Sequence, residues 1–212
     1  METVGGKTVM GDIYNYYKIC VSGAADTGHC GINAYDKAKV LGREIVHQGG
    51  VIVTGATTGF PLWSAIGAKE VGGFSIGFSP AGSEKEHTEV YNLPTDYMDI
   101  VIYTGFGYPG RDLILTRSSD AVIFGCGRIG TIHEFTIAFE DNKPIGILEA
   151  DWDTDDVIRT IIEKGNRPNA KIVFDTDPKA LVEKIMELRR KDKEHHSTFR
   201  FEKTTEREKK AQ

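Results

Sequence analysis

Seven short apolar runs recur along the chain, and each is typical of a buried β-strand. They lie at residues 17–22, 51–54, 74–79, 99–104, 121–125, 144–149 and 171–174. Segments with apolar residues near the 3.6-residue period of a helix stand between and after them, at residues 34–48, 61–73, 111–119, 131–142, 153–165 and 177–191. Apolar strands separated by helices predict an α/β fold. We expect a Rossmann-like, doubly wound, mainly parallel sheet of about seven strands with helices on both faces.

Four glycine-rich segments follow predicted strands, at residues 23–31, 55–59, 105–110 and 125–130. In a doubly wound sheet these segments gather at the carboxyl ends of the strands, where ligands bind. Each also leads into a helix N-terminus, whose free N–H groups and positive dipole end favour an anion such as a phosphate. The alternative is that the glycines only form tight turns. Because several such loops converge on one edge, we favour a ligand site.

The stretch GCGRIGTIHE at residues 125–134 carries the strongest candidate chemistry. Gly127 and Gly130 would let the backbone approach a phosphate, and Thr131 could donate hydrogen bonds to it. Glu134 is expected in the first turn of the next helix, where a carboxylate commonly serves as a capping or dipole partner. Capping and catalysis both stay open for it at this point.

Arg111 is expected to open the preceding predicted helix, where the helix dipole disfavours a cation. An arginine there needs an anionic ligand or a carboxylate partner, whereas Asp112 beside it is ordinary compensation for a helix N-terminus. Familiar signatures are missing from the sequence: there is no Walker P-loop, no GxSxG elbow and no HExxH.

Composition narrows the function classes further. The formal net charge of −5 argues against a dedicated nucleic-acid-binding protein. Cys20, Cys30 and Cys126 form no CxxC pair, so we predict neither a disulfide framework nor a metal finger, and a reducing cytoplasm fits best. His29 beside Cys30 has no further ligand at metal spacing, and neither has the pair His195–His196, so we expect no metal and no resident cofactor. No signal peptide or membrane span is predicted.

The last 22 residues differ from the rest because they are highly charged and nearly free of apolar positions. We therefore expect one nucleotide-binding domain over residues 1–190 and a charged, flexible tail over 191–212. Docking of this tail on a partner chain is the alternative.

The residues around Glu134 resemble the P-G-G-x-G-T-x-x-E signature of the Lonely Guy (LOG) family, formerly called lysine decarboxylase-like, within the SLOG superfamily. Gly127, Gly130, Thr131 and Glu134 match that signature. The family's active-site arginine falls nine residues before the aspartate of the "DA" pair, which in this chain leads from Asp120 to Arg111. The order of strands and loops also fits over roughly residues 17–185.

This resemblance implies hydrolysis of the N-glycosidic bond of a nucleoside 5′-monophosphate, which yields free base and ribose 5-phosphate. Glu134 would stabilise the positive charge that develops on the ribose, and Arg111 would keep Glu134 ionised. The implied phosphate- and nucleotide-binding residues are Gly23, Gly55, Thr58, Gly59, Gly127, Arg128, Gly130 and Thr131. A homodimer or larger homo-oligomer is also implied, with a small phosphorylated molecule as partner and neither nucleic acid nor membrane.

Two departures from the LOG signature point to another branch of the superfamily. Cys126 stands at the position of the proline, and Arg128 replaces one of the paired glycines. With Arg111–Asp112 in place of the usual arginine context, the chain looks more like the branch that includes molybdenum-cofactor carrier proteins. Three hypotheses follow: a phosphoribohydrolase, a non-catalytic nucleotide or phosphorylated-pterin carrier, and a plain α/β domain whose function lies in its tail.

Overall fold

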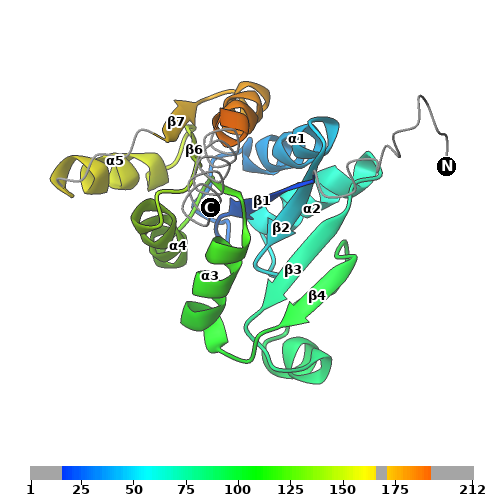
Figure 1. Cartoon of the computed structure of the whole chain (residues 1–212). Coiled ribbons are helices and arrows are strands. Elements are labelled where there is room, and N and C mark those ends of the chain that lie inside the picture. Colours follow the sequence, from blue (N-terminus) through cyan, green and yellow to red (C-terminus); the bar gives the residue numbers. More distant parts are fainter. Residues whose placement is uncertain (1–15, 166–170, 192–212) are drawn as a thin grey trace, which may run out of the picture.

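The structure, a computed structural model, describes residues 16–165 and 171–191. Seven strands form one sheet in the order β4-β3-β2-β1-β5-β6-β7, and every neighbouring pair is parallel (Figure 1). The strands are β1 (Tyr17–Ser22), β2 (Gly50–Thr54), β3 (Ser75–Ser79), β4 (Ile100–Tyr103), β5 (Ala121–Phe124), β6 (Ile145–Leu148) and β7 (Ile172–Asp175). The predicted parallel α/β sheet is therefore confirmed.

Helices cover both faces of this sheet, as the apolar pattern predicts. One face packs against α1 (Ala34–His47), α2 (Phe60–Glu70) and a helix over residues 178–191, which contribute Leu41, Phe60 and Ile185 to a common core. The other face packs against α3 (Gly107–Ser118), α4 (Ile129–Glu140) and α5 (Thr154–Lys164), with Phe135 among its buried residues. Burial on both faces explains why the central strands carry apolar residues at nearly every position.

Two helices begin earlier than the sequence pattern suggests, and this changes the place of both candidate catalytic residues. Helix α3 begins at Gly107, because Pro109 fits within a first helical turn, where its missing N–H costs nothing. Arg111 therefore lies in the second turn of α3 rather than at its start. Helix α4 begins at Ile129, which likewise moves Glu134 out of the first turn. The expected positions of both residues at a helix start are therefore wrong, and the capping or dipole role considered for Glu134 does not apply.

One further element lies inside the loop expected at residues 80–97. It is η1 (Glu86–Val90), a single turn of π-helix, and its His87 is buried against Ser79 at the end of β3. This turn lies beside the sheet edge formed by β4, away from the centre of the sheet.

The strand order reverses between β1 and β5, at the centre of the sheet. Strands added after β1 extend in one direction to β4, and β5 starts the other direction from β1. The loop after β1 and the loop after β5 therefore lie side by side, and the Ala24 N–H donates to the carbonyl of Cys126 at 2.7 Å. Such a switch point is the usual ligand crevice of an open α/β sheet.

No helix of the described part of the chain is long and apolar enough to cross a bilayer. The predicted charged tail at 191–212 lies outside the described residues except for Lys191, and His195 and His196 lie there too.

Candidate functional site

Glu134 and Ser22 meet at the carboxyl end of β1. The Ser22 hydroxyl donates a short hydrogen bond to the Glu134 carboxyl, and both side chains are buried. The charge of Asp112, which comes from α3, also acts on the Glu134 carboxyl group. Glu134 is thus held by Ser22 and influenced by a second buried carboxylate.

Arg111 is held in the same buried cluster. Its Nε lies 2.9 Å from Asp112 Oδ1, and its Nη1 donates to the carbonyl of Gly55 after β2. Only 6% of Arg111 is exposed, and the ring of Tyr108 lies 5.6 Å from its guanidinium carbon. The carboxylate in ion-pair contact with Arg111 is therefore Asp112. Glu134 interacts with the charge of Arg111 electrostatically and makes no ion pair with it.

The protonation of Glu134 reflects this environment. Burial raises the pKa of Glu134 to about 7, from an ordinary value of 4.5. The charge of Arg111 opposes the rise, whereas the charge of Asp112 adds to it. At neutral pH the carboxyl group is therefore close to half-protonated, so Arg111 does not keep it fully ionised as the resemblance to LOG enzymes implies.

This pKa predicts a pH-dependent stability. Between pH 4.5 and about 7 the folded protein holds a proton that the unfolded chain has released, so stability falls as pH rises through this window. The loss amounts to about 3 kcal/mol in the free energy of unfolding. Glu134→Gln mimics the protonated acid, so it should match the natural protein at pH 5 and exceed its stability at pH 8. Urea unfolding at both values measures this, with Glu163→Gln on α5 as control. Equal stability at pH 8 would contradict it.

Asp112 is the residue that sequence reasoning misjudged. It is 4% exposed, and its Oδ1 pairs with Arg111. Its Oδ2 lies 3.0 Å from Nδ1 of His133. It therefore joins α3 to α4 and is no terminal compensation for a helix dipole. Ser22 and His133 are likewise absent from the predicted set. An apolar strand ending in serine was the one available signal for Ser22.

The glycines predicted to admit a ligand are mostly close-packed against the protein itself. A Cβ atom would lie 1.6 Å from Arg111 Nη1 at Gly55, 2.3 Å from Thr131 Oγ1 at Gly127, and 2.8 Å from Phe60 at Gly23. Gly59 has a φ of +71° and approaches the carbonyl of Ala24. These glycines are required by packing, and their predicted contact with a phosphate stays a prediction.

The N-terminus of α4 has a different character because it is open. A Cβ atom on Gly130 would meet nothing within 4 Å. No side chain of the described residues caps this helix end, and its first turn carries no acid. The exposed Arg128 precedes it, and a cavity of about 240 Å³ lies against it, lined by Arg128 and Ile129 and, among others, by His29 and Asp153. This end of α4 offers free N–H donors beside a cation, which suits an anion.

The other predicted binding residues take part in the packing of the loops. Thr131 is buried against Gly127, and the exposed Thr58 donates to the carbonyl of Ala25 at 3.1 Å. The loop at 55–59 is thereby joined to the loop after β1. The structure thus gathers the predicted binding residues at the carboxyl ends of β1, β2 and β5.

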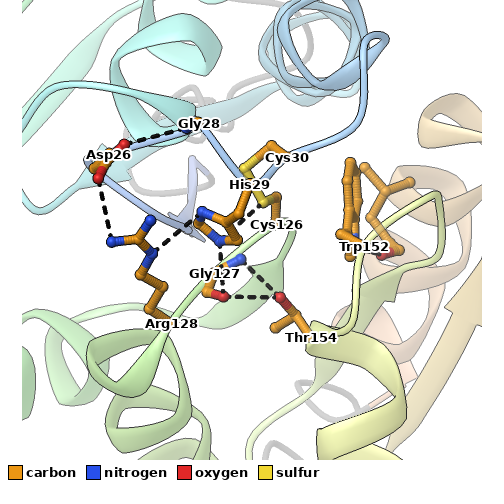
Figure 2. The surroundings of a disulfide bond; sticks show 10 residues. Asp26, Gly28, His29, Cys30, Cys126, Gly127, Arg128, Trp152 and Thr154 are labelled. Atoms are coloured by element: carbon orange, nitrogen blue, oxygen red, sulfur yellow. Dashed lines mark hydrogen bonds and ion pairs between the residues drawn. A yellow bond between two sulfur atoms is a disulfide. The ribbon is translucent and has the colours of Figure 1, made fainter.

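The cysteines depart from the sequence prediction. Cys30 and Cys126, 96 residues apart, form a disulfide that joins the loop after β1 to the loop after β5 (Figure 2). Spacing along the chain could not reveal this bond, because the two loops become neighbours only once β1 pairs with β5. The expectation of no disulfide is therefore wrong. The argument for a reducing cytoplasm loses its basis, and that location stays a prediction.

The fold also brings Cys126 next to His29 and Cys30. These two residues have no third metal-ligating residue near them in sequence, and Cys126 supplies it in the structure.

The chain has clear relatives of this architecture. The model of the SLOG cluster4 family matches residues 16–182. An uncharacterised protein of Archaeoglobus fulgidus is 33% identical over 132 residues, which are 62% of this chain and 82% of that protein. The molybdenum cofactor binding protein of Rippkaea orientalis is 26% identical, with a TM-score of 0.68 over 82% of this chain and 98% of that one. The molybdenum cofactor carrier protein of Chlamydomonas reinhardtii is 26% identical, with a TM-score of 0.64 over 81% and 98%.

Proposed function

Because this chain belongs to the SLOG cluster4 family, as its resemblance to the SLOG superfamily predicts, we propose that it binds a phosphorylated small molecule without turning it over. The ligand is a nucleotide or a phosphorylated pterin, held in the crevice between the carboxyl ends of β1 and β5. One observation supports this choice above all: the protein itself occupies both groups that a LOG hydrolase would use.

Those two groups are Arg111 and Glu134. The guanidinium of Arg111 is neutralised by Asp112 and bound by the carbonyl of Gly55, and Glu134 is bound by Ser22. Each side chain is only 6% exposed. A carboxylate that stabilises an oxocarbenium-like centre must be ionised and in contact with the ribose. Here Glu134 is near half-protonated at neutral pH and faces protein partners, which favours a structural and positioning role.

The binding determinants lie at the open end of α4. The phosphate would accept hydrogen bonds from the free N–H groups of the first turn around Gly130 and replace Asp26 as the partner of Arg128. The ion pair of Arg128 with Asp26, at 3.2 Å, is weak because the two side chains are 55% and 71% exposed. The likeness to two molybdenum cofactor proteins supports a pterin as one ligand class. The homo-oligomer implied by the family resemblance is part of this proposal, as is a cytoplasmic location.

Arg128→Ala should weaken binding of a nucleoside monophosphate. Removing a charge-assisted hydrogen bond to a phosphate costs about 1.5–3 kcal/mol, so we expect a rise in Kd of at least about tenfold. Calorimetric titration with AMP measures it. The matched control is Arg117→Ala, which removes the same charge at the opposite end of the sheet, where Arg117 pairs with Asp141. Equal weakening by both substitutions would indicate a general charge effect and contradict the site.

Gly130→Asp should raise stability and lower ligand affinity together. The position is open, and glycine inside a helix is unfavourable by about 0.5–1 kcal/mol. A carboxylate near a helix N-terminus adds about 0.3–1 kcal/mol. The same carboxylate would occupy the anion site and repel a phosphate. Thermal unfolding and AMP titration measure the two effects, and Gly130→Asn is the neutral control that should keep binding. Undiminished affinity in Gly130→Asp would exclude this helix end as the phosphate site.

A second function rests on a specific observation. The pKa of Glu134, about 7, is suited to a group that exchanges a proton near neutral pH. If Glu134 is catalytic, the protein would hydrolyse the N-glycosidic bond of a nucleoside 5′-monophosphate. Its activity would then rise as the pH increases through 7 and Glu134 ionises. Incubation with AMP, GMP, CMP and UMP distinguishes the two functions. Our proposal predicts ligand-induced thermal stabilisation with no free base, whereas release of base that is lost in Glu134→Gln would establish the hydrolase.

A further inference from the structure

Three groups that ligate soft metals meet over the β1–β5 crevice. His29 and Cys30 come from the loop after β1, and Cys126 comes from the loop after β5. Their ligand atoms all lie within 4.8 Å of one another. Figure 2 shows the imidazole of His29 beside the bond between the two sulfur atoms. None of these groups takes part in the Arg111–Asp112–Glu134 cluster.

The spacing of these groups fits a zinc ion. Zn–S bonds of about 2.3 Å and Zn–N bonds of about 2.0–2.1 Å at a tetrahedral angle place a sulfur and a nitrogen ligand about 3.6 Å apart. The observed distance from His29 Nε2 to Cys126 Sγ is 3.5 Å. Two sulfur ligands would lie about 3.8 Å apart by the same geometry. Rotation about the Cα–Cβ bonds supplies that separation, since the Cα atoms of Cys30 and Cys126 are 5.7 Å apart.

We propose that Cys30, Cys126 and His29 form a zinc site when the disulfide is reduced, so that the protein alternates between an S–S bond and a bound metal at one place. A dithiol reductant supplies two electrons and two protons to the S–S bond and becomes a disulfide itself. Zinc then displaces the two thiol protons and binds two thiolates and the neutral imidazole. The three protein ligands leave the fourth position for water or an external ligand.

The surroundings support entry and binding of the ion. Cys126 is fully buried, whereas His29 is exposed and lines the cavity of about 240 Å³ beside α4. A metal can therefore reach the buried sulfur from solvent past the imidazole.

Metal binding would also change the partner of Arg128. Nε of Arg128 lies 3.2 Å from Nδ1 of His29, which accepts its hydrogen bond. Coordination through Nε2 places the ring proton on Nδ1, so this acceptor is lost. Arg128 keeps its ion pair with Asp26 at 3.2 Å. The zinc site therefore acts on the cation that precedes α4, although the proposal itself does not depend on the identity of the phosphorylated ligand.

Titration of the reduced protein with Zn²⁺ tests the proposal. The full chain is reduced with a phosphine, treated with chelator and freed of both under nitrogen, with His195 and His196 replaced by Asn so that they add no ligand. We expect one Zn²⁺ per chain for the reduced protein and none for the oxidised one. Cys30→Ser and Cys126→Ser should each weaken binding by about a hundredfold or more, and His29→Ala by about tenfold. Cys20→Ala is the matched control, because Cys20 is buried in the core and should leave the stoichiometry unchanged.

Substitution of Co²⁺ for Zn²⁺ gives a second readout that does not depend on affinity. Thiolate-to-cobalt charge transfer should appear with the reduced protein and should be lost in Cys30→Ser. His29 is exposed, so His29→Ala tests the ligand set even where Cys126→Ser fails to fold. Reduced protein that takes up no Zn²⁺ at micromolar concentration would overturn the proposal. Equal binding by the oxidised protein or by the serine variants would overturn it as well, and the cysteines would then serve as a structural disulfide.

Discussion

Asp112→Asn is expected to lower the free energy of unfolding by about 3 kcal/mol at pH 6, because it leaves the buried guanidinium of Arg111 without its counter-charge. Asp112 and Arg111 are 6% and 7% exposed at their side chains, so solvent screens their attraction very little. Asparagine keeps the shape of the side chain and removes only its charge, which isolates the effect of the ion pair. Urea unfolding measures the loss.

The size of this loss should depend on pH in a defined direction. The charge of Asp112 raises the pKa of Glu134, so its removal lowers that pKa from about 7. At pH 8 the ionised Glu134 can replace the missing charge near Arg111, whereas at pH 6 it does so less completely. The variant should therefore lose more stability at pH 6 than at pH 8.

Asp141→Asn is the matched control for Asp112→Asn. It removes a carboxylate at the end of α4 that pairs with Arg117, which lies in α3 like Arg111. That arginine side chain is 62% exposed, so the loss in the free energy of unfolding should stay below about 1 kcal/mol. Equal losses from the two substitutions would contradict the central role of Asp112 in the buried cluster.

Loss of the Cys30–Cys126 bond should produce a comparable or larger change. A cross-link that closes a loop of about 100 residues stabilises a protein by about 4–5 kcal/mol in the chain-entropy model, and measured values are typically about 2–4 kcal/mol. The two cysteines are 96 positions apart. We therefore expect the free energy of unfolding of the metal-free double variant Cys30→Ala/Cys126→Ala to be about 3 kcal/mol lower than that of the oxidised natural protein.

Reduction of the natural protein should have the same effect as this double substitution when no metal is present. Cys20→Ala keeps the disulfide and should show the full difference between oxidising and reducing buffer. If the oxidised and reduced natural proteins unfold at the same urea concentration, the bond adds no stability and this prediction is wrong.

The sheet could be predicted because its signal is local. The apolar runs match the observed strands to within one or two residues at each end, and the central strands need apolar residues throughout because they are buried on both faces. The start of α3 could not be predicted, because Pro109 and Gly110 suggest a chain break although proline fits a first helical turn. Arg111 and Glu134 were found from a motif, but their shared partner Asp112 depends on how α3 packs against α4.

The glycines also show that a sequence does not identify the partners that residues meet in the fold. Gly55 and Gly127 were singled out because a phosphate would need a close approach to the backbone. The structure gives each of them a protein neighbour instead, Arg111 for Gly55 and Thr131 for Gly127. A sequence reveals that a glycine is needed for close approach, but only the fold shows what approaches it. The disulfide was missed for a related reason, because it depends on the pairing of β1 with β5.

A crystal structure with bound AMP would locate the phosphate site and show whether the nucleotide is cleaved. We expect an intact nucleotide in the β1–β5 crevice, with its phosphate within hydrogen-bond distance of the backbone N–H of Gly130 and the guanidinium of Arg128. The rival position is the cavity of about 540 Å³ at the opposite end of the sheet, where Lys18, Lys143 and Arg189 gather. A phosphate in that cavity, or a cleaved nucleotide beside Glu134, would contradict a non-catalytic binding site at the N-terminus of α4.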